Sequence, residues 1–149
     1  MEKPVKDNIG GSGFHNSFWL YFFSKFVNPG LIIESGVWKG QTSWFFRQAC
    51  PDAQIHCFDI DLSRVVYRDP SIQFHEMDWA GFDFNPKPDA LNLCFFDCHI
   101  NHAKRIREAY DRGFKLLLFD DNPSLEYLFA FGLPGMPTVN ILMDDRVKE

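Results

Sequence analysis

The feature that most constrains the fold is a short apolar run that ends in an acid and is followed by two glycines. Residues 31–40 read LIIESGVWKG, and residues 41–46 continue as QTSWFF. This pattern predicts a strand, a tight glycine turn and a helix N-terminus, where backbone N–H groups can meet a small ligand. The spacing is E-x-G-x-x-x-G, which differs from the G-x-G-x-x-G of dinucleotide-binding turns. Glu34 would repel a pyrophosphate, so the turn favours a ligand with positive charge, such as an ammonium or a sulfonium.

Apolar runs alternate with helical patterns along the rest of the chain. The strongest strand candidates are continuously apolar, which is typical of a parallel sheet with helices on both faces. We therefore predict the α/β class. The predicted strands are 31–34, 54–59, 71–76, 91–96 and 114–119, and the predicted helices are 14–27, 41–49, 101–112, 125–131 and 138–147.

The chain has 149 residues, which fits one domain over 14–149 preceded by a polar, glycine-rich segment, 1–13, that we expect to be flexible. The net charge of −5, with no basic stripe, argues against nucleic acid as a partner. The most apolar window, 14–27, is too short and too polar to span a membrane, and no leader pattern is present. The four cysteines do not form a C-x-x-C motif, so we expect reduced thiols in a cytoplasmic protein.

Two of the predicted helices have a distinctive side-chain pattern. Phe14, Phe18, Phe22 and Phe26 recur every fourth residue, and we expect this aromatic face to pack against the sheet, with part of it available for a dimer contact. Helix 101–112 is charged. We expect its basic residues to form a solvated face: Lys104, Arg105 and Arg107.

Acidic residues stand at the ends of four predicted strands: Glu34, Asp59, Asp97 and Asp120. A single acid after a strand is usually a loop residue or a helix N-cap. In a parallel sheet, however, all the carboxyl ends lie along one edge, and that edge holds the ligand crevice. The four acids and the glycine turn together therefore predict one site at this edge.

The order of these motifs resembles that of class I S-adenosylmethionine (SAM)-dependent methyltransferases. The resemblance implies that ESGVWKG holds the methionine end of the cofactor, that Asp59 binds the ribose hydroxyls and that Asp78 meets the adenine amino group. Trp79 would lie against the adenine ring, with a core tryptophan as the alternative. Ser43 would donate a hydrogen bond to the ligand carboxylate or cap the helix. The implied cofactor-binding residues are Glu34, Gly36, Gly40, Thr42, Ser43, Asp59, Asp78 and Trp79.

The segments FFDCH (95–99) and LFDDN (118–122) are similar to those of metal-dependent O-methyltransferases of the macrolide-sugar and catechol types. The resemblance implies a Mg²⁺ site formed by Asp97, Asp120 and Asp121, because this cation prefers oxygen ligands. It also implies catalytic roles for Asp97 and His99, with His99 as a general base. Relatives often have Asp-Gly-Asp-His where this chain has Asp97-Cys98-His99, which is one residue shorter.

The resemblance further implies a Rossmann-like, doubly wound sheet with strand order 3-2-1-4-5. Methyltransferases of this class continue after strand five into an antiparallel hairpin, and we expect no such hairpin within these 149 residues. Strand 114–119 would then be an open apolar edge, so we expect self-association into a homo-oligomer or a closing C-terminal segment.

The leading hypothesis is a SAM-dependent enzyme that methylates a hydroxyl of a small molecule or sugar, with Mg²⁺ as a candidate cofactor. The alternative is a non-catalytic or truncated nucleotide-binding module of the same fold. The glycine spacing disfavours a dehydrogenase. A zinc cluster of Cys94, Cys98, His99 and His102 matches no common ligand spacing and is also disfavoured.

Overall fold

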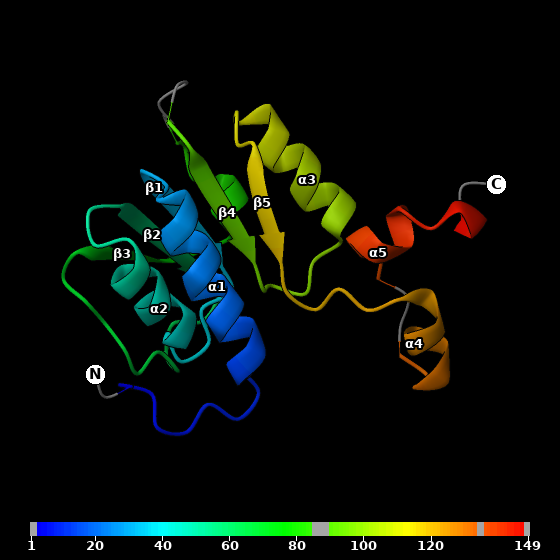
Figure 1. Cartoon of the computed structure of the whole chain (residues 1–149), viewed down its shortest axis with the longest axis horizontal. Helices are drawn as coiled ribbons and strands as arrows, with labels where there is room; N and C mark the ends of the chain where they lie inside the picture. The colour runs from blue at the N-terminus through cyan, green and yellow to red at the C-terminus, as the bar shows by residue number, and fades with distance from the viewer. Residues whose placement is uncertain (1–2, 85–89, 134–135, 148–149) are drawn as a thin grey trace.

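Five parallel strands form the centre of the molecule in this computed structural model, which describes residues 3–84, 90–133 and 136–147 (Figure 1). The strand order is β3-β2-β1-β4-β5, as predicted. Each neighbouring pair is parallel, so the carboxyl ends of all five strands lie along one edge. The strands are β1 (Leu31–Ser35), β2 (Gln54–Asp59), β3 (Ile72–Glu76), β4 (Asn92–Phe96) and β5 (Leu116–Phe119).

Helices cover both faces of the sheet and create two apolar cores. The helices α1 (Phe14–Val27) and α2 (Gln41–Ala49) cover one face, and α3 (His102–Asp111) covers the other. Successive strand residues point to opposite faces, so Ile32 belongs to the first core and Ile33 to the second. Burial on both faces explains why the strands are continuously apolar.

The predicted elements agree with the observed ones to within two residues over most of the chain. The exception is the predicted helix 138–147, which is broken into α5 (Val139–Leu142) and a 3-10 turn, η2 (Asp145–Val147). The helix α4 (Leu125–Ala130) is short and stands away from the sheet (Figure 1), and a 3-10 turn, η1 (Trp79–Gly81), follows β3. No strand follows β5 within the described residues, and the β5 edge away from β4 has no partner strand there.

The orientation of α1 differs from the prediction. The helix buries Ser17, Leu20 and Ser24 and leaves the ridge that begins at Phe14 and ends at Phe26 exposed. The small serine side chains bring α1 close to α2: the Cys50 thiol donates to the Ser24 carbonyl at 3.2 Å, and Gln41 donates to the Ser17 hydroxyl. The expectation that the aromatic ridge packs against the sheet was therefore wrong.

The N-terminal segment contacts the turn after β1 over its described part, residues 3–13. Val5 is buried. The Trp38 indole donates to the Ile9 carbonyl at 3.1 Å, and the Lys39 ammonium donates to the Asp7 carbonyl at 2.9 Å. These contacts place a segment that we predicted to be flexible beside the glycine turn.

None of the helices in the described ranges has the length and apolar character that crossing a membrane requires. The four cysteines form no disulfide, and Cys50, Cys57 and Cys94 are buried.

Replacing Gly36 with alanine should destabilise the protein strongly. Gly36 has φ +98°, and a Cβ there would overlap the carbonyl group of Asp97 at the end of β4. Gly113 is the matched control, because its φ is +79° but a Cβ there would meet no atom within 4 Å. We expect Gly36→Ala to lower the free energy of unfolding by about 3 kcal/mol or more, and Gly113→Ala to lower it by about 1 kcal/mol. Urea unfolding measures both, and equal losses would contradict this account.

Candidate functional site

The carboxyl edge of the sheet contains a cavity of about 350 Å³. Its lining includes Gly36 from the turn after β1, Asp59 from the end of β2 and Asp97 from the residue after β4. Trp38 and Asp78 also line it. Three of the predicted acids therefore face one cavity, which is of the size that small-molecule sites commonly have.

The turn after β1 is held against the neighbouring strands by backbone hydrogen bonds. The Gly36 N–H donates to the Phe58 carbonyl at 2.8 Å, and the Asp97 N–H donates to the Ser35 carbonyl at 2.8 Å. One carboxylate oxygen of Asp59, Oδ2, accepts from the N–H groups of Val37 and Trp38 at 2.8 and 3.3 Å. Asp59 therefore holds the turn, and its carboxylate lies in the cavity wall.

Glu34 does not line this cavity. Its side chain is fully buried on the α2 side of β1, where the carboxylate accepts hydrogen bonds from the hydroxyls of Thr42 and Ser43 and from the Cys57 thiol. Burial raises the pKa of Glu34 to about 7, although these donors favour the charged form. The Glu34 carboxylate thus binds the side chains of Thr42 and Ser43, and all three residues were predicted to bind the cofactor.

Gly40 does not line the cavity, but it stabilises the turn. It is the N-cap residue of α2 with φ +83°, and a Cβ there would lie 2.8 Å from the Tyr67 carbonyl oxygen. Its N–H donates to the Val37 carbonyl at 2.9 Å, which closes the turn before the helix begins. A glycine is needed here because of the left-handed backbone and the close approach of Tyr67.

Asp78 lines the cavity together with Arg105, a residue that the sequence did not single out for this site. The guanidinium of Arg105 donates to both oxygens of Asp78, at 3.0 and 2.8 Å, and to Glu108 at 2.7 Å. Burial acts to raise the pKa of Asp78, but the hydrogen bonds from Arg105 and Ala80 outweigh it and lower the pKa. Arg105 is 1% exposed, so the expectation that it belongs to a solvated face was wrong.

The helical spacing of residues along α3 could have predicted that Arg105 is buried. The buried residues of α3 are His102, Arg105 and Ala109, which lie on one face at intervals of three and four residues.

Trp79 is also fully buried, within the second core, and packs against Phe96 with ring centroids 5.4 Å apart. Trp79 does not line the cavity. This corresponds to a core tryptophan, the alternative to a contact with the adenine ring.

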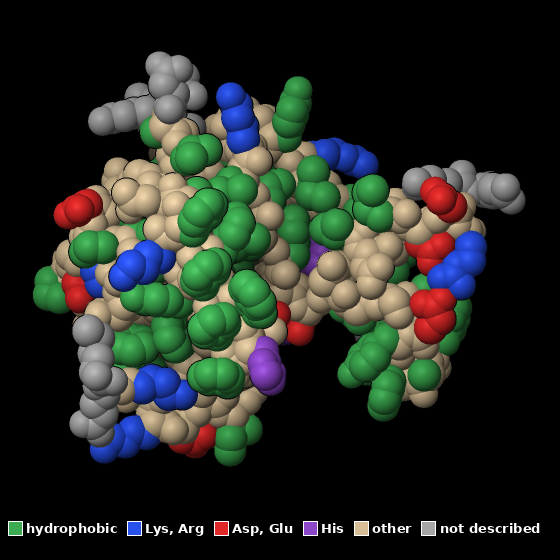
Figure 2. All heavy atoms as spheres, in the orientation of Figure 1, with side chains coloured by type: hydrophobic (Ala, Val, Ile, Leu, Met, Phe, Trp, Pro, Cys, Tyr) green, Lys and Arg blue, Asp and Glu red, His purple; other side chains and the backbone are tan. Residues whose placement is uncertain are grey.

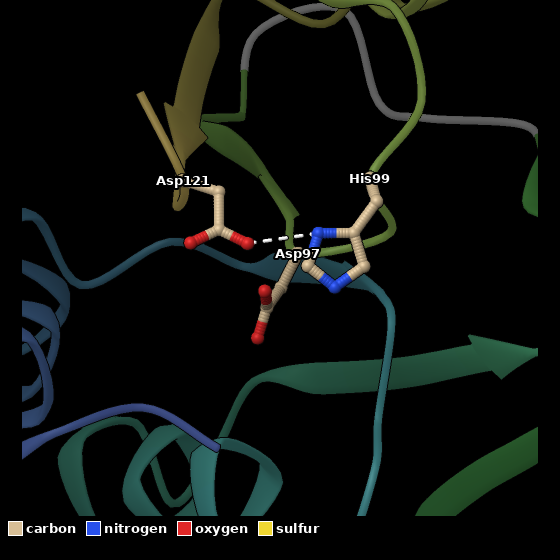
Figure 3. A group of neighbouring side chains, drawn as sticks. All are labelled: Asp97, His99 and Asp121. Atoms are coloured by element: carbon tan, nitrogen blue, oxygen red, sulfur yellow. Dashed lines mark ion pairs between the residues drawn. The ribbon is translucent and has the colours of Figure 1, made fainter. Parts of the chain in front are cut away.

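Two acids and a histidine meet where the ends of β4 and β5 adjoin. One ligand atom from each of Asp97, His99 and Asp121 lies within 4.8 Å of the others. Figure 3 shows the His99 imidazole directed at the Asp121 carboxylate, and the two atoms His99 Nδ1 and Asp121 Oδ2 are 2.8 Å apart. Burial, together with repulsion from Asp120 and Asp121, raises the pKa of Asp97 to about 8.

Asp120, the third predicted metal ligand, lies beside this group but outside it. Its Oδ1 accepts a hydrogen bond from the Asn16 amide of α1 at 2.8 Å, and burial raises the pKa of its carboxyl group. Asp120, Asp121 and His99 line a second, larger cavity of about 1130 Å³ between the end of β5 and the segment that carries α4. His99 lines both cavities, so the cluster of Asp97, His99 and Asp121 lies where they meet.

The residues of the alternative zinc cluster have other partners. Cys94 is buried inside β4, and Cys98 accepts a long hydrogen bond from Arg105 Nε at 3.4 Å. His102 Nδ1 accepts from the Val139 N–H at 3.1 Å, and its ring packs on Phe119. These contacts give three of the four residues structural roles.

Several solved structures have a similar arrangement of strands and helices, and two of those described below are methyltransferases. The structure of cmcI-N160 with SAH matches with a TM-score of 0.64 and 19% identity over 78% of this chain. The SAH-bound methyltransferase PaMTH1 of Podospora anserina matches with a TM-score of 0.61 and 20% identity over 93% of this chain. The chain has the Rossmann-like α/β fold of these structures. A methyltransferase of Geobacter sulfurreducens is also similar, with a TM-score of 0.59 and 17% identity over 83% of this chain.

The matched region is part of each of these proteins. The chain spans 64% of the cmcI-N160 chain, 63% of PaMTH1 and 66% of the Geobacter methyltransferase. A second structure, of cmcI-D160 with Mg-SAM, has a TM-score of 0.62 and 19% identity, and the chain spans 56% of it. No protein-family model and no curated protein matches the chain.

Replacing Asp97 with asparagine should stabilise the metal-free protein at alkaline pH. The folded state holds the Asp97 proton more tightly than the unfolded state, since the pKa rises from 3.8 to about 8. Ionisation therefore costs stability progressively as the pH rises from about 4 to about 8, and asparagine avoids this cost. We expect Asp97→Asn to add about 1–3 kcal/mol to the free energy of unfolding at pH 8.5 and much less at pH 4.5.

Urea unfolding in EDTA measures both values, with Asp52→Asn, at an exposed carboxylate, as the control. A gain that is the same at both pH values would contradict the proposed burial of a protonated Asp97.

Proposed function

We propose that this protein is a SAM-dependent methyltransferase that acts on a hydroxyl of a small molecule or sugar with the help of a divalent cation. The observation that carries the proposal is the junction of two cavities at Asp97, His99 and Asp121. One cavity has the glycine turn and Asp59 in its wall, and the other is larger and open to an acceptor. The similarity to structures that contain SAH and Mg-SAM supports this assignment.

The residues of the smaller cavity suit the two ends of SAM. The Asp59 carboxylate uses Oδ2 for the turn, and its other oxygen, Oδ1, accepts a bond of 3.2 Å from the Asp61 N–H. A carboxylate has further acceptor sites, which suit a pair of ribose hydroxyls. At the other end, the backbone of Gly36 lines the cavity beside Asp97, whose ionised form a cationic group would stabilise. When bound, SAM supplies the methyl group.

The cluster of Asp97, His99 and Asp121 fits a divalent cation. Two carboxylates are the ligand type that Mg²⁺ prefers, and the imidazole nitrogen also suits Mn²⁺ and Zn²⁺. When bound, such a cation lowers the pKa of a hydroxyl that it holds. The residues themselves would set the position of the acceptor at the cavity junction, so the main contribution of the protein is to align acceptor and donor.

The contacts of His99 are compatible with two roles, as a general base or as a metal ligand. Its Nδ1 pairs with Asp121, which leaves Nε2 as the atom that can accept a proton from an acceptor hydroxyl. Alternatively Nδ1 binds the cation together with the two carboxylates. Methylation of a substrate without added metal would support the role as a general base. A lower metal affinity in His99→Ala would support the role as a metal ligand.

A nucleotide-binding module without catalysis is the second candidate. Gly36 and Asp59 line the smaller cavity whether or not the cluster of Asp97, His99 and Asp121 is catalytic, which supports this candidate. Turnover separates the two candidates: SAM binding without methyl transfer to a panel of catechols and sugars, with and without Mg²⁺, favours the module. Binding of NAD in place of SAM would favour a dehydrogenase.

A small-molecule acceptor remains the proposed partner, and we propose a reducing compartment, such as the cytoplasm, because the four cysteines are free.

Calorimetric titration of SAM into the wild type and Asp59→Asn tests the cofactor assignment. Asparagine keeps one oxygen for the N–H groups of Val37 and Trp38 but replaces the other acceptor with an NH₂ donor. We expect the variant to bind SAM about 10–100-fold more weakly, as the loss of one hydrogen bond to a charged group would imply. Asp61→Asn, at the exposed neighbouring carboxylate, should bind as the wild type does. No heat from the wild type at millimolar SAM would exclude the cofactor.

Metal binding should strengthen as the pH rises, because Asp97 must lose its proton to become a ligand and its pKa is about 8. Titration of Mn²⁺, followed by electron paramagnetic resonance, should show about tenfold tighter binding for each pH unit between 6 and 8. Asp121→Asn should weaken binding at all pH values, whereas Asp52→Asn should not. Affinity that does not depend on pH, or that is unchanged in Asp121→Asn, would exclude this cluster as the metal site.

A further inference from the structure

The aromatic ridge of α1 is the largest apolar feature that the fold leaves uncovered. Phe14 and Phe26 at its ends are 79% and 81% exposed, and Phe18 and Phe22 between them are 49% and 53% exposed. Trp19 lies one step round the helix and is 63% exposed. Figure 2 shows hydrophobic side chains gathered over α1 on this face of the molecule. We name these five side chains the α1 ridge.

The area of the α1 ridge is large for a monomer and suited to a dimer. An aromatic side chain buries about 150–250 Å² when it is fully covered. With the exposed fractions above, the α1 ridge presents roughly 500–800 Å². Monomers seldom leave more than about 300–600 Å² of contiguous apolar surface exposed. A stable dimer buries about 800 Å² on each partner, so the α1 ridge supplies most of one side of such an interface.

The rows of side chains suit a second copy of the same helix. Phe14, Phe18 and Phe22 stack along the helix, with ring centroids 6.4 and 6.3 Å apart. Side chains spaced four residues apart form a continuous ridge, and such ridges pack into the grooves of an identical helix in the commonest class of helix packing. An interface of this kind is isologous, which is the usual arrangement in homodimers.

Charge also favours approach through this face. The chain has a net charge of −5, so two copies repel each other over most orientations. The 14 residues of α1 contain no acid, and Lys25 is their only charged side chain. The α1 ridge is therefore a surface where two copies meet without acidic groups facing one another.

An apolar groove extends the surface toward the open edge of the sheet. The groove has a volume of about 300 Å³ and lies between Trp19 and Phe23 of α1 and Leu118 and Phe119 of β5. Asn16 and Asp120 lie at its polar end, and its apolar part gives a side chain from an apposed helix a place to insert. The groove and the α1 ridge are continuous through Trp19.

We propose that the protein forms a homodimer in which the α1 ridge packs against the α1 ridge of a second copy across a two-fold axis. The proposal does not depend on the function proposed above, because neither Phe18 nor Phe22 lines the cavities at the carboxyl edge of the sheet.

Sedimentation velocity from 1 to 100 µM tests the proposal on the full chain. We expect the wild type to sediment as a dimer in the upper part of this range. The double variant Phe18→Ser/Phe22→Ser should weaken association about 100-fold or more, because central aromatic side chains are often the main contributors to an interface. The control is Tyr110→Ser on α3, since Tyr110 is 78% exposed on the other side of the sheet. The control should remain dimeric.

A wild type that is monomeric at 100 µM overturns the proposal, and so does a double variant that dimerises as the wild type does. Thermal unfolding of each variant shows whether it is folded. If the double variant does not fold, cross-linking tests whether two copies meet through the α1 ridge. Treated with a bifunctional thiol-specific cross-linker, Phe22→Cys should form a covalent dimer, and Tyr110→Cys should not. The absence of a cross-link in Phe22→Cys, or equal cross-linking in both variants, overturns the proposal.

Discussion

The turn after β1 crosses the end of β4 at a distance that leaves no room for a side chain at position 36, and the rest of the site depends on this contact. A Cβ on Gly36 would overlap the carbonyl group of Asp97. Because Asp97 also donates to the Ser35 carbonyl, the turn and the end of β4 are fixed relative to each other. Asp59 binds the far side of the same turn through Val37 and Trp38. The contact therefore sets the position of the Asp59 carboxylate relative to that of Asp97 in the cavity wall.

The fold and the location of the site could be predicted from the sequence because both follow from local patterns. Continuously apolar runs identified the strands, and the strand order follows from the resemblance to a known fold. Acids at the ends of parallel strands must lie along one edge, so the convergence of Asp59 and Asp97 needed no knowledge of packing. Gly36 was recognisable because its neighbours form a strand and a helix that only a tight turn can connect.

The roles of individual side chains could not be predicted where they depend on direction and on distant partners. Glu34 is in the strand itself, and the alternation of side chains sends it under α2, away from the cavity, where Thr42 and Ser43 bind it. Arg105 belongs to a charged helix, but its position on the buried face pairs it with Asp78, 27 residues earlier. The aromatic ridge of α1 faces outward because the small side chains of the opposite face fit more closely against α2, a choice that hydrophobicity alone does not indicate.

A crystal structure of the protein with SAH tests the central claim most directly, since it locates the ligand relative to the turn. The account predicts that the ribose hydroxyls lie within hydrogen-bonding distance of the Asp59 carboxylate, with the homocysteine end beside Gly36. SAH bound elsewhere on the molecule, or a cavity that remains without SAH at millimolar concentration, would contradict the claim that the carboxyl edge of this sheet binds an adenosyl cofactor.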